Sequence, residues 1–193
     1  MSTDHSLRLF FALLPDAKIA SRMNRMSKTL SLSCHGRAMT RHSLHLTLAF
    51  LGETPAERLE SLIAIGLQVS ILSGCTMSLT RLTRLNRSIV CLEPDVIPPE
   101  LMSLYDSITS ALLADHFPVE QRRFRPHITL VRRVSPTAPV DKVLRTAIAY
   151  PVRELALMSS DRRSDGSQYQ ALARWTLGLA ALPVSRETYS DRP

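Results

Sequence analysis

Two kinds of hydrophobic pattern occur along the chain. Strands are expected where apolar residues are continuous or alternate with polar ones, over Leu7–Leu14, Ser43–Phe50, Met77–Leu85, Ser88–Leu92, His127–Val131, Val152–Met158 and Gln168–Leu177. Helices are expected where apolar residues recur every three or four positions, after Pro15, from Thr54 and from Pro98, with a further short helix over Asp141–Ala149. The order lacks a regular strand–helix–strand alternation. It therefore favours an α+β architecture over a doubly wound parallel sheet.

One short pattern occurs twice within these strands. His45-Leu46-Thr47-Leu48 recurs as His127-Ile128-Thr129-Leu130, 82 residues further on. Because side chains alternate along a strand, each copy places its histidine and threonine on one face. The opposite face of the first copy is predicted to be core: Leu44, Leu46, Leu48 and Phe50. A single histidine in a strand is more often an ordinary polar residue, but chance duplication of the whole pattern on matched strands is improbable.

Paired histidines and threonines suit the hydrolysis of a phosphodiester. Two histidines can supply a neutral base that activates water and a protonated acid that protonates the departing oxygen. Threonine hydroxyls can donate hydrogen bonds to the phosphate oxygens, and the scheme needs no metal ion or cofactor. Metal binding is disfavoured because His42 and His45, three residues apart, would lie on opposite faces of a strand. No phosphate-binding glycine motif is present.

The net positive charge indicates a class of binding partner, but it does not indicate a reaction. Lys and Arg number 24 against 17 acidic residues, the pI is about 9.9, and only three of the cations are lysines. Such a balance favours anionic partners such as nucleic acid, although an excess of arginine over lysine also follows from genomic base composition. Arginines gather at three places that could follow an RNA backbone, or could simply be solvated: Arg81/Arg84/Arg87, Arg122/Arg123/Arg125 and Arg162/Arg163. Phe11, Tyr169 and Trp175 are candidate stacking residues.

Composition and cysteine usage suggest where the protein works. No apolar stretch is long enough for a membrane span, and Leu7–Leu14 is too short for the core of a signal peptide. Three widely spaced cysteines, Cys34, Cys75 and Cys91, fit reduced thiols rather than a disulfide framework. We therefore expect a cytoplasmic protein that does not associate with membranes, and a monomer.

The repeated motif and its flanks resemble the 2H phosphoesterase superfamily. The resemblance extends to the RNA 2′,3′-cyclic phosphodiesterases, historically described as 2′-5′ RNA ligases, through Arg8–Ala12, His45–Gly52 and Arg125–Leu130. It implies a bilobal α+β fold with two pseudo-symmetric antiparallel-sheet lobes and outer helices, formed by residues 1–183 and followed by a polar tail, 184–193. It also implies that RNA 2′,3′-cyclic phosphate ends are hydrolysed to 2′-phosphates.

The resemblance also implies roles for five residues. His45 would protonate the leaving 3′-oxygen, His127 would activate water, and Thr47 and Thr129 would hold the phosphate. Arg132 stands where similar proteins have an arginine, but strict alternation places it opposite Thr129. A bulge or strand end would have to redirect it, or Arg133 would serve instead.

Three other activities stay open on the sequence alone. The site could act on small cyclic nucleotides instead of RNA ends. The chain could be a non-catalytic RNA-binding module that uses the same cleft. A minor ligase activity is also conceivable, because joining RNA ends is the reverse of opening a phosphodiester at the same site.

Overall fold

The computed structural model describes residues 6–120, 122–138, 140, 142–163 and 166–178. The predicted polar tail, 184–193, lies outside them. The helices are α1 (Ala17–Cys34), α2 (Leu59–Val69) and α3 (Pro99–Ala114), with 3-10 turns at Arg41–Ser43 and Ala56–Arg58. The strands are β1 (Ser6–Leu13), β2 (Arg37–Ala38), β3 (Leu46–Pro55), β4 (Cys75–Leu85), β5 (Ile89–Pro94), β6 (Ile128–Arg132), β7 (Lys142–Val152), β8 (Glu154–Arg163) and β9 (Gly166–Thr176).

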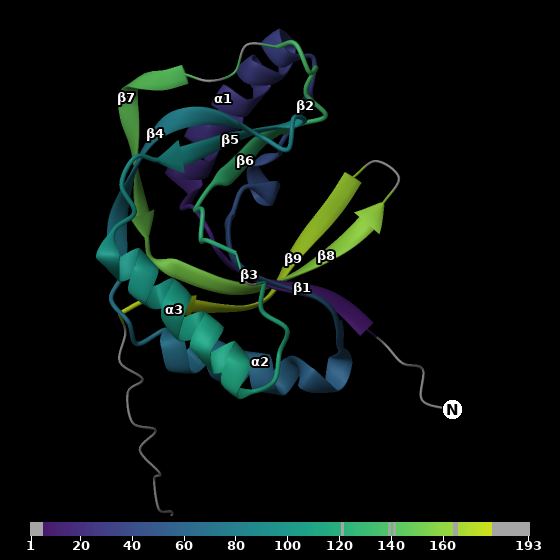
Figure 1. Ribbon diagram of the computed structural model, residues 1–193, viewed down its shortest axis with the longest axis vertical. Helices are drawn as coiled ribbons and strands as arrows, with labels where there is room; N and C mark the ends of the chain where they lie inside the picture. The colour runs from purple at the N-terminus through teal and green to yellow at the C-terminus, as the bar shows by residue number, and fades with distance from the viewer. Residues whose placement is uncertain (1–5, 121, 139, 141, 164–165, 179–193) are drawn as a thin grey trace, which may run out of the picture.

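The strands form one antiparallel sheet in the order β7-β4-β5-β6-β3-β1-β8-β9, and β2 pairs with β6 (Figure 1). The sheet has two halves, β7-β4-β5-β6 and β3-β1-β8-β9. A single paired position, Leu46 with Ile128, joins β3 to β6 and so joins the halves. The strands that carry the two His–Thr motifs thus meet at the centre of the sheet.

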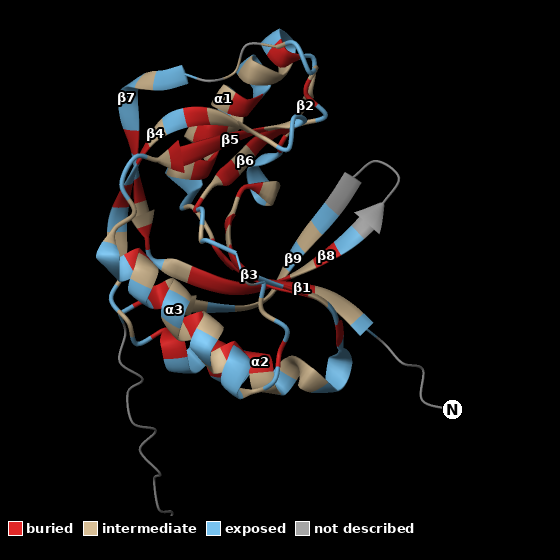
Figure 2. Cartoon of the chain, in the orientation of Figure 1, coloured by how far each residue is buried: buried red, intermediate tan, exposed pale blue. Residues whose placement is uncertain are grey.

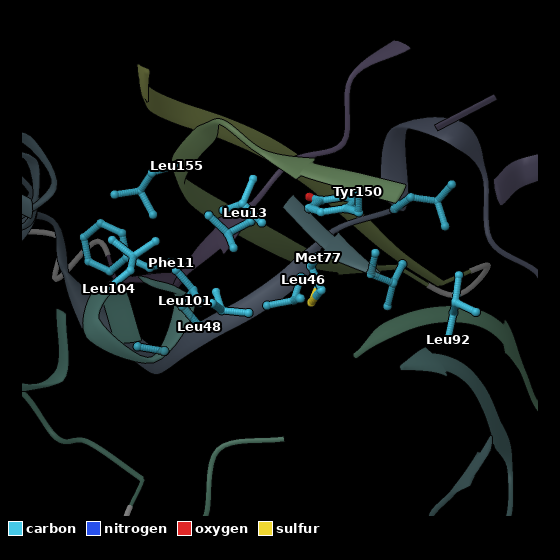
Figure 3. Close-up of a cluster of buried hydrophobic side chains, with 14 of the residues drawn as sticks. Phe11, Leu13, Leu46, Leu48, Met77, Leu92, Leu101, Leu104, Tyr150 and Leu155 are labelled. Carbon is cyan, nitrogen blue, oxygen red and sulfur yellow. The ribbon is translucent and has the colours of Figure 1, made fainter. Parts of the chain in front are cut away.

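Helices cover each half of the sheet on the side of the core. α1 packs on β6, while α3 packs on β3 and α2 packs on β8, β9 and α3 (Figure 1). The buried residues trace the inner faces of these elements through both halves (Figure 2). Leu46 and Leu48 of β3 belong to the same buried cluster as Leu101 and Leu104 of α3 (Figure 3). The backbone under both motifs is therefore fixed by apolar packing.

Most predicted elements are present, with differences at three places. The short helix predicted over Asp141–Ala149 is wrong, because β7 occupies this region and pairs with β4. Its C-terminal part alternates as a strand should, and Ile148, Tyr150 and Val152 are buried. The second helix begins at Leu59 rather than near Thr54, since β3 continues to Pro55. The terminal hairpin is confirmed, with strands that extend further into the loop predicted over residues 159–167.

None of the helices in the described part of the chain is both long enough and apolar enough to cross a membrane. All three cysteines are free thiols, and Cys34 and Cys91 are buried. The side chains of Arg162 and Arg163, named above as a possible RNA contact, lie outside what the structure describes.

Candidate active site

The register between β3 and β6 brings the two motifs together. Leu46 pairs with Ile128, and both side chains are fully buried in the core. In an antiparallel pair centred there, the preceding and following residues of both strands point to the opposite face. His45 then lies across from Thr129, and Thr47 lies across from His127. The two histidines are diagonal neighbours, at a Cα separation of about 7–8 Å for such positions.

Both histidine rings are held in the same way. His45 Nδ1 lies 2.9 Å from the carbonyl oxygen of Ser43, and His127 Nδ1 lies 2.8 Å from that of Arg125. A carbonyl oxygen only accepts hydrogen bonds, so Nδ1 carries the proton in each ring. This leaves Nε2 of both rings to take up or release a proton. In each case the anchoring carbonyl belongs to the residue two positions earlier.

Matching irregularities stand at the last residue of each motif. In the pairing of β1 with β3, Phe11 faces Ala49 while Ala12 faces Thr47, so Leu48 is an extra residue. In the pairing of β5 with β6, Val90 faces Val131 while Cys91 faces Thr129, so Leu130 is extra. A bulge shifts the alternation by one residue, and the residues after it change faces.

The bulges place Phe50 and Arg132 on the same face as the motifs. Leu48 and Ala49 are both buried, and Phe50 is 38% exposed, so the prediction that Phe50 faces the core is wrong. Arg132 lines a pocket together with His45 and Thr47. The bulge considered from the sequence is thus present. Arg133 lies beyond the strand, exposed and with a positive φ of 56°.

Helix α1 holds the second bulge from behind. The carbonyl of Leu130 accepts hydrogen bonds from the Ser27 hydroxyl and from the backbone N–H of Met39, the latter at 2.8 Å. The same hydroxyl accepts a hydrogen bond of 2.9 Å from the Met39 N–H. Ser27 is fully buried. A side chain of the core thereby fixes the backbone that orients Arg132.

Two adjoining hollows contain motif residues in their linings. The His45 pocket, about 230 Å³, is lined by His45, Arg132 and residues of β1, β8 and β9: Arg8, Phe10, Ser160 and Tyr169. The His127 groove, about 180 Å³, is lined by His127, by residues of β3 and α3, and by residues 119, 120 and 122–125. Thr47 and Phe50 line both hollows, so the two adjoin at these side chains. A ligand held at Thr47 would have a histidine on either side.

The His45 ring lies in an apolar setting. It contacts the rings of Phe10 and Tyr169 at centroid distances of 5.0 and 4.9 Å. Burial lowers the pKa of His45 from 6.5 to about 4, and the positive charges of Arg132 and His127 lower it further, against the hydrogen bond to Ser43. His45 is therefore neutral at pH 7.

Thr129 and Arg125 are tied to the neighbouring strand β5. Burial raises the pKa of the Cys91 thiol to about 12, opposed by a hydrogen bond from the Thr129 hydroxyl. Arg125 Nε lies 2.8 Å from a carboxylate oxygen of Glu93, a nearly buried residue. The Arg125 side chain is half exposed. This ion pair holds the segment whose carbonyl anchors His127.

The predicted stacking residues have different settings. Tyr169 lines the His45 pocket, whereas Phe11 is fully buried in the core and Trp175 packs against it. Phe10 was not predicted as a pocket residue, although alternation along β1 places it on the same face as Arg8. Arg8 lies over the Phe50 ring, 4.7 Å from its centre. Phe50 was missed because the bulge that redirects it has no signal in the local pattern.

Known proteins share this sequence and this architecture. The 2′-5′ RNA ligase superfamily matches residues 15–164. An Escherichia coli K12 protein named RNA 2′,3′-cyclic phosphodiesterase is 31% identical over 171 residues, 88% of this chain and 96% of that protein. A protein of the same name from Thermus thermophilus is 28% identical over 188 residues, 89% and 90% of the two chains. The crystal structure of E. coli LigT complexed with 3′-AMP matches with a TM-score of 0.76 and 29% identity, over 91% of this chain and 100% of that one.

The α+β fold and the two His–Thr pairs on one face of its sheet define a phosphodiesterase of the 2H class. The chain belongs to the 2′-5′ RNA ligase superfamily. The resemblance and the fold class predicted from the sequence are thus confirmed.

Proposed function

We propose that the protein hydrolyses RNA 2′,3′-cyclic phosphate ends to 2′-phosphates without a metal ion. The observation that carries this proposal is the Leu46–Ile128 register, which gives both His–Thr pairs one common face. The names of the E. coli and Thermus relatives support the substrate. Among the residues that the structure describes, no group of three or more His, Cys, Asp or Glu side chains could hold a metal ion.

The reaction is an in-line displacement at phosphorus. His127 Nε2 takes a proton from water, whose oxygen attacks the phosphorus from the side of the groove. The bond from phosphorus to the 3′-oxygen breaks, and His45 Nε2 gives its proton to that oxygen. Thr47, Thr129 and Arg132 bind the non-bridging oxygens, where negative charge gathers in the transition state. The product carries a 2′-phosphate and a 3′-hydroxyl.

The scheme requires a protonated His45, and the negative charge of the bound substrate raises the pKa of this residue. The pKa of His45 is about 4. A phosphate anion about 4 Å from the ring stabilises its protonated form by about 4 kcal/mol at an effective dielectric constant of about 20. That energy corresponds to about three pH units, which brings the pKa of His45 close to neutrality. His45 therefore becomes an acid when the substrate binds.

The reverse reaction at this site would join RNA ends. The 5′-hydroxyl of a second RNA then replaces water as the nucleophile, and the product is a 2′-5′ linkage. Water is far more concentrated than any dissolved hydroxyl and competes with it, so ligation is a minor outcome.

The test uses an oligonucleotide that ends in a 2′,3′-cyclic phosphate, in excess EDTA. We expect hydrolysis to a 2′-phosphate, and a loss of about 10³-fold or more in kcat/KM for His45→Ala and for His127→Ala. Unchanged rates in both variants, or a requirement for added metal, would refute the mechanism. A preference for cyclic mononucleotides over oligonucleotides would shift the substrate to small cyclic nucleotides. Salt-sensitive RNA binding without turnover would indicate a binding module.

A further inference from the structure

The net positive charge of the protein comes almost entirely from one segment. Residues 17–52 contain six basic residues and no acidic residue, which leaves 18 basic against 17 acidic residues for the rest of the chain. The six cations are Lys18, Arg22, Arg25, Lys28, Arg37 and Arg41. The charge that favours an anionic partner is therefore concentrated in α1 and in the short stretch between α1 and β3.

Four of these cations form a stripe along the outer side of α1. The residues that α1 buries against the core are Ala20, Met23, Ser27 and Cys34. With 3.6 residues per turn, the opposite side of the helix carries Lys18, Arg22, Arg25 and Lys28, and we call these four residues the α1 face. Three of them are exposed, and none forms a salt bridge with a residue that the structure describes.

The charges of the α1 face repel one another. Lys18 and Arg22 are four residues apart, and Arg22, Arg25 and Lys28 follow at intervals of three, so adjacent cations destabilise the helix. A solvated helix face usually mixes charges of both signs, and α1 has no carboxylate that would relieve the repulsion. A bound polyanion relieves it. From Lys18 to Lys28 the α1 face is about 15 Å long, which is enough to contact several phosphates of one strand.

A hollow lies between the α1 face and the active site. The α1 pocket, about 540 Å³, is lined by Ala17 in the first turn of α1, by Arg41 and by Tyr169, among others. Tyr169 also lines the His45 pocket, so the two hollows adjoin at its side chain. Arg41 is exposed and has no salt bridge to the described part of the chain. A strand that leaves the His45 pocket past Tyr169 therefore meets Arg41 and then the N-terminal end of the α1 face.

The acidic residues that line the α1 pocket have partners of their own. Asp16 is the N-cap of α1, and its carboxylate accepts a hydrogen bond of 2.8 Å from the N–H of Ile19. Glu154 pairs with Arg174 at 2.8 Å. Both negative charges are thus partly compensated, while Arg41 keeps its charge available for a phosphate.

The direction of the proposed reaction leaves the α1 pocket to the RNA strand. In an in-line displacement, the entering and leaving oxygens lie on opposite sides of the phosphorus. His45 serves the leaving 3′-oxygen, so the terminal nucleotide lies in the His45 pocket. Two hollows adjoin this pocket, and water enters from the His127 groove. The strand, which continues from the 5′-oxygen of the terminal nucleotide, has the α1 pocket as its path.

We propose that the α1 face and Arg41 bind the phosphate backbone of the RNA strand whose cyclic end lies in the His45 pocket. The proposal rests on the proposed function and names its substrate as a strand of several nucleotides rather than a mononucleotide. The contacts are ionic and independent of base sequence. Because they lie away from the reacting atoms, they strengthen the binding of a strand and leave the hydrolysis of a cyclic mononucleotide unchanged.

The test compares two triple variants on a short and a long substrate. The α1 variant is Lys18→Gln/Arg25→Gln/Lys28→Gln, in which glutamine keeps the helix propensity. The control variant is Lys142→Gln/Arg145→Gln/Arg153→Gln, which removes the same charge from three exposed positions along and just after β7. The substrates are adenosine 2′,3′-cyclic monophosphate and an oligonucleotide of about 12 nucleotides with a 2′,3′-cyclic end, each assayed at several salt concentrations.

We expect the α1 variant to lose about tenfold in kcat/KM for the oligonucleotide at low salt, through a higher KM. The slope of log(kcat/KM) against log[salt] should become shallower by about 2, at about 0.7 for each lost phosphate contact with a single strand. The same variant should hydrolyse the mononucleotide at the wild-type rate, which also shows that it is folded. Equal losses in the α1 and control variants would overturn the proposal, because the net charge alone would then explain them. So would an α1 variant that equals the wild type on both substrates.

The wild-type protein distinguishes failure of this proposal from failure of the proposed function. Hydrolysis of both substrates by the wild type, with no selective loss in the α1 variant, would contradict the α1 face alone. Hydrolysis of neither substrate would contradict the proposed function. Salt-dependent binding of the oligonucleotide that weakens only in the α1 variant would then still support the α1 face as an RNA-binding surface.

Discussion

Replacement of His45 should flatten the pH dependence of stability between pH 4 and 6.5. The pKa of His45 is about 4 in the folded protein, against 6.5 for an unperturbed histidine. Between these values the unfolded chain binds a proton that the folded protein does not, so the free energy of unfolding falls as the pH falls. This loss in the free energy of unfolding is absent above about pH 6.5 and is complete below about pH 4.

The size of the effect follows from this shift in pKa. The full cost is about 3 kcal/mol, at 1.36 kcal/mol per pH unit. Between pH 7 and pH 5 the same two pKa values give a loss of about 2 kcal/mol from this group alone. That loss is a large part of the stability of a typical domain, about 5–15 kcal/mol. It should therefore be visible in equilibrium unfolding.

The assay is urea unfolding at pH 5 and pH 7, followed by the fluorescence of Trp175, the single tryptophan. His45→Gln removes the titrating group, so the wild-type protein should lose about 2 kcal/mol more than this variant between the two pH values. Any constant cost of the substitution cancels in the comparison. In Arg132→Gln the pKa of His45 should rise, because a nearby positive charge is removed, and the pH effect should shrink. Identical pH dependence in the wild type and His45→Gln would refute the reasoning.

Three further substitutions test how the fold supports the site. Arg132→Gln should lower kcat/KM about 10- to 100-fold in steady-state hydrolysis assays, because an ionic contact to phosphate is lost. Ser27→Ala should cost about 0.5–1.5 kcal/mol in urea unfolding, since the Leu130 carbonyl and the Met39 N–H each lose one buried partner and keep only each other. It should also raise KM, because the bulge at Leu130 orients Arg132. Gly36→Ala should cost about 1–3 kcal/mol in thermal or urea unfolding, because its Cβ would lie 2.9 Å from the carbonyl oxygen of Arg132. A Gly36→Ala protein as stable as the wild type would show that this close approach can relax.

Local patterns predicted the faces of the motif strands because alternation is a local property. His45 and Thr47 share a face through the geometry of two successive residues, and so do His127 and Thr129. The pairing of Leu46 with Ile128 is not local, and only the repeat itself indicated that the two strands meet. The region after Pro139 was misassigned for a related reason. The hydrophobic pattern of residues 142–149 does not distinguish a helix from a strand. The pairing with β4 determines their conformation.

The orientation of Arg132 could not be predicted from the local sequence pattern. Strict alternation places Arg132 in the core, and only the extra residue Leu130 brings it into the pocket with His45. What holds that bulge is a hydrogen bond from Ser27, 103 residues away in the sequence. No pattern within β6 records this contact.

Because of the two bulges, each repeat contributes a third side chain to the face that carries its histidine and threonine. Each motif histidine is followed two residues later by its threonine, and five residues later by a side chain that returns to the same face. That residue is Phe50 in the first copy and Arg132 in the second. The two His–Thr pairs have the same spacing and the same backbone anchor, so the motif residues alone give a bound phosphodiester two similar ends. A ring at one position and a cation at the other can, because only the cation attracts a phosphate oxygen and only the ring presents a flat apolar face to a base.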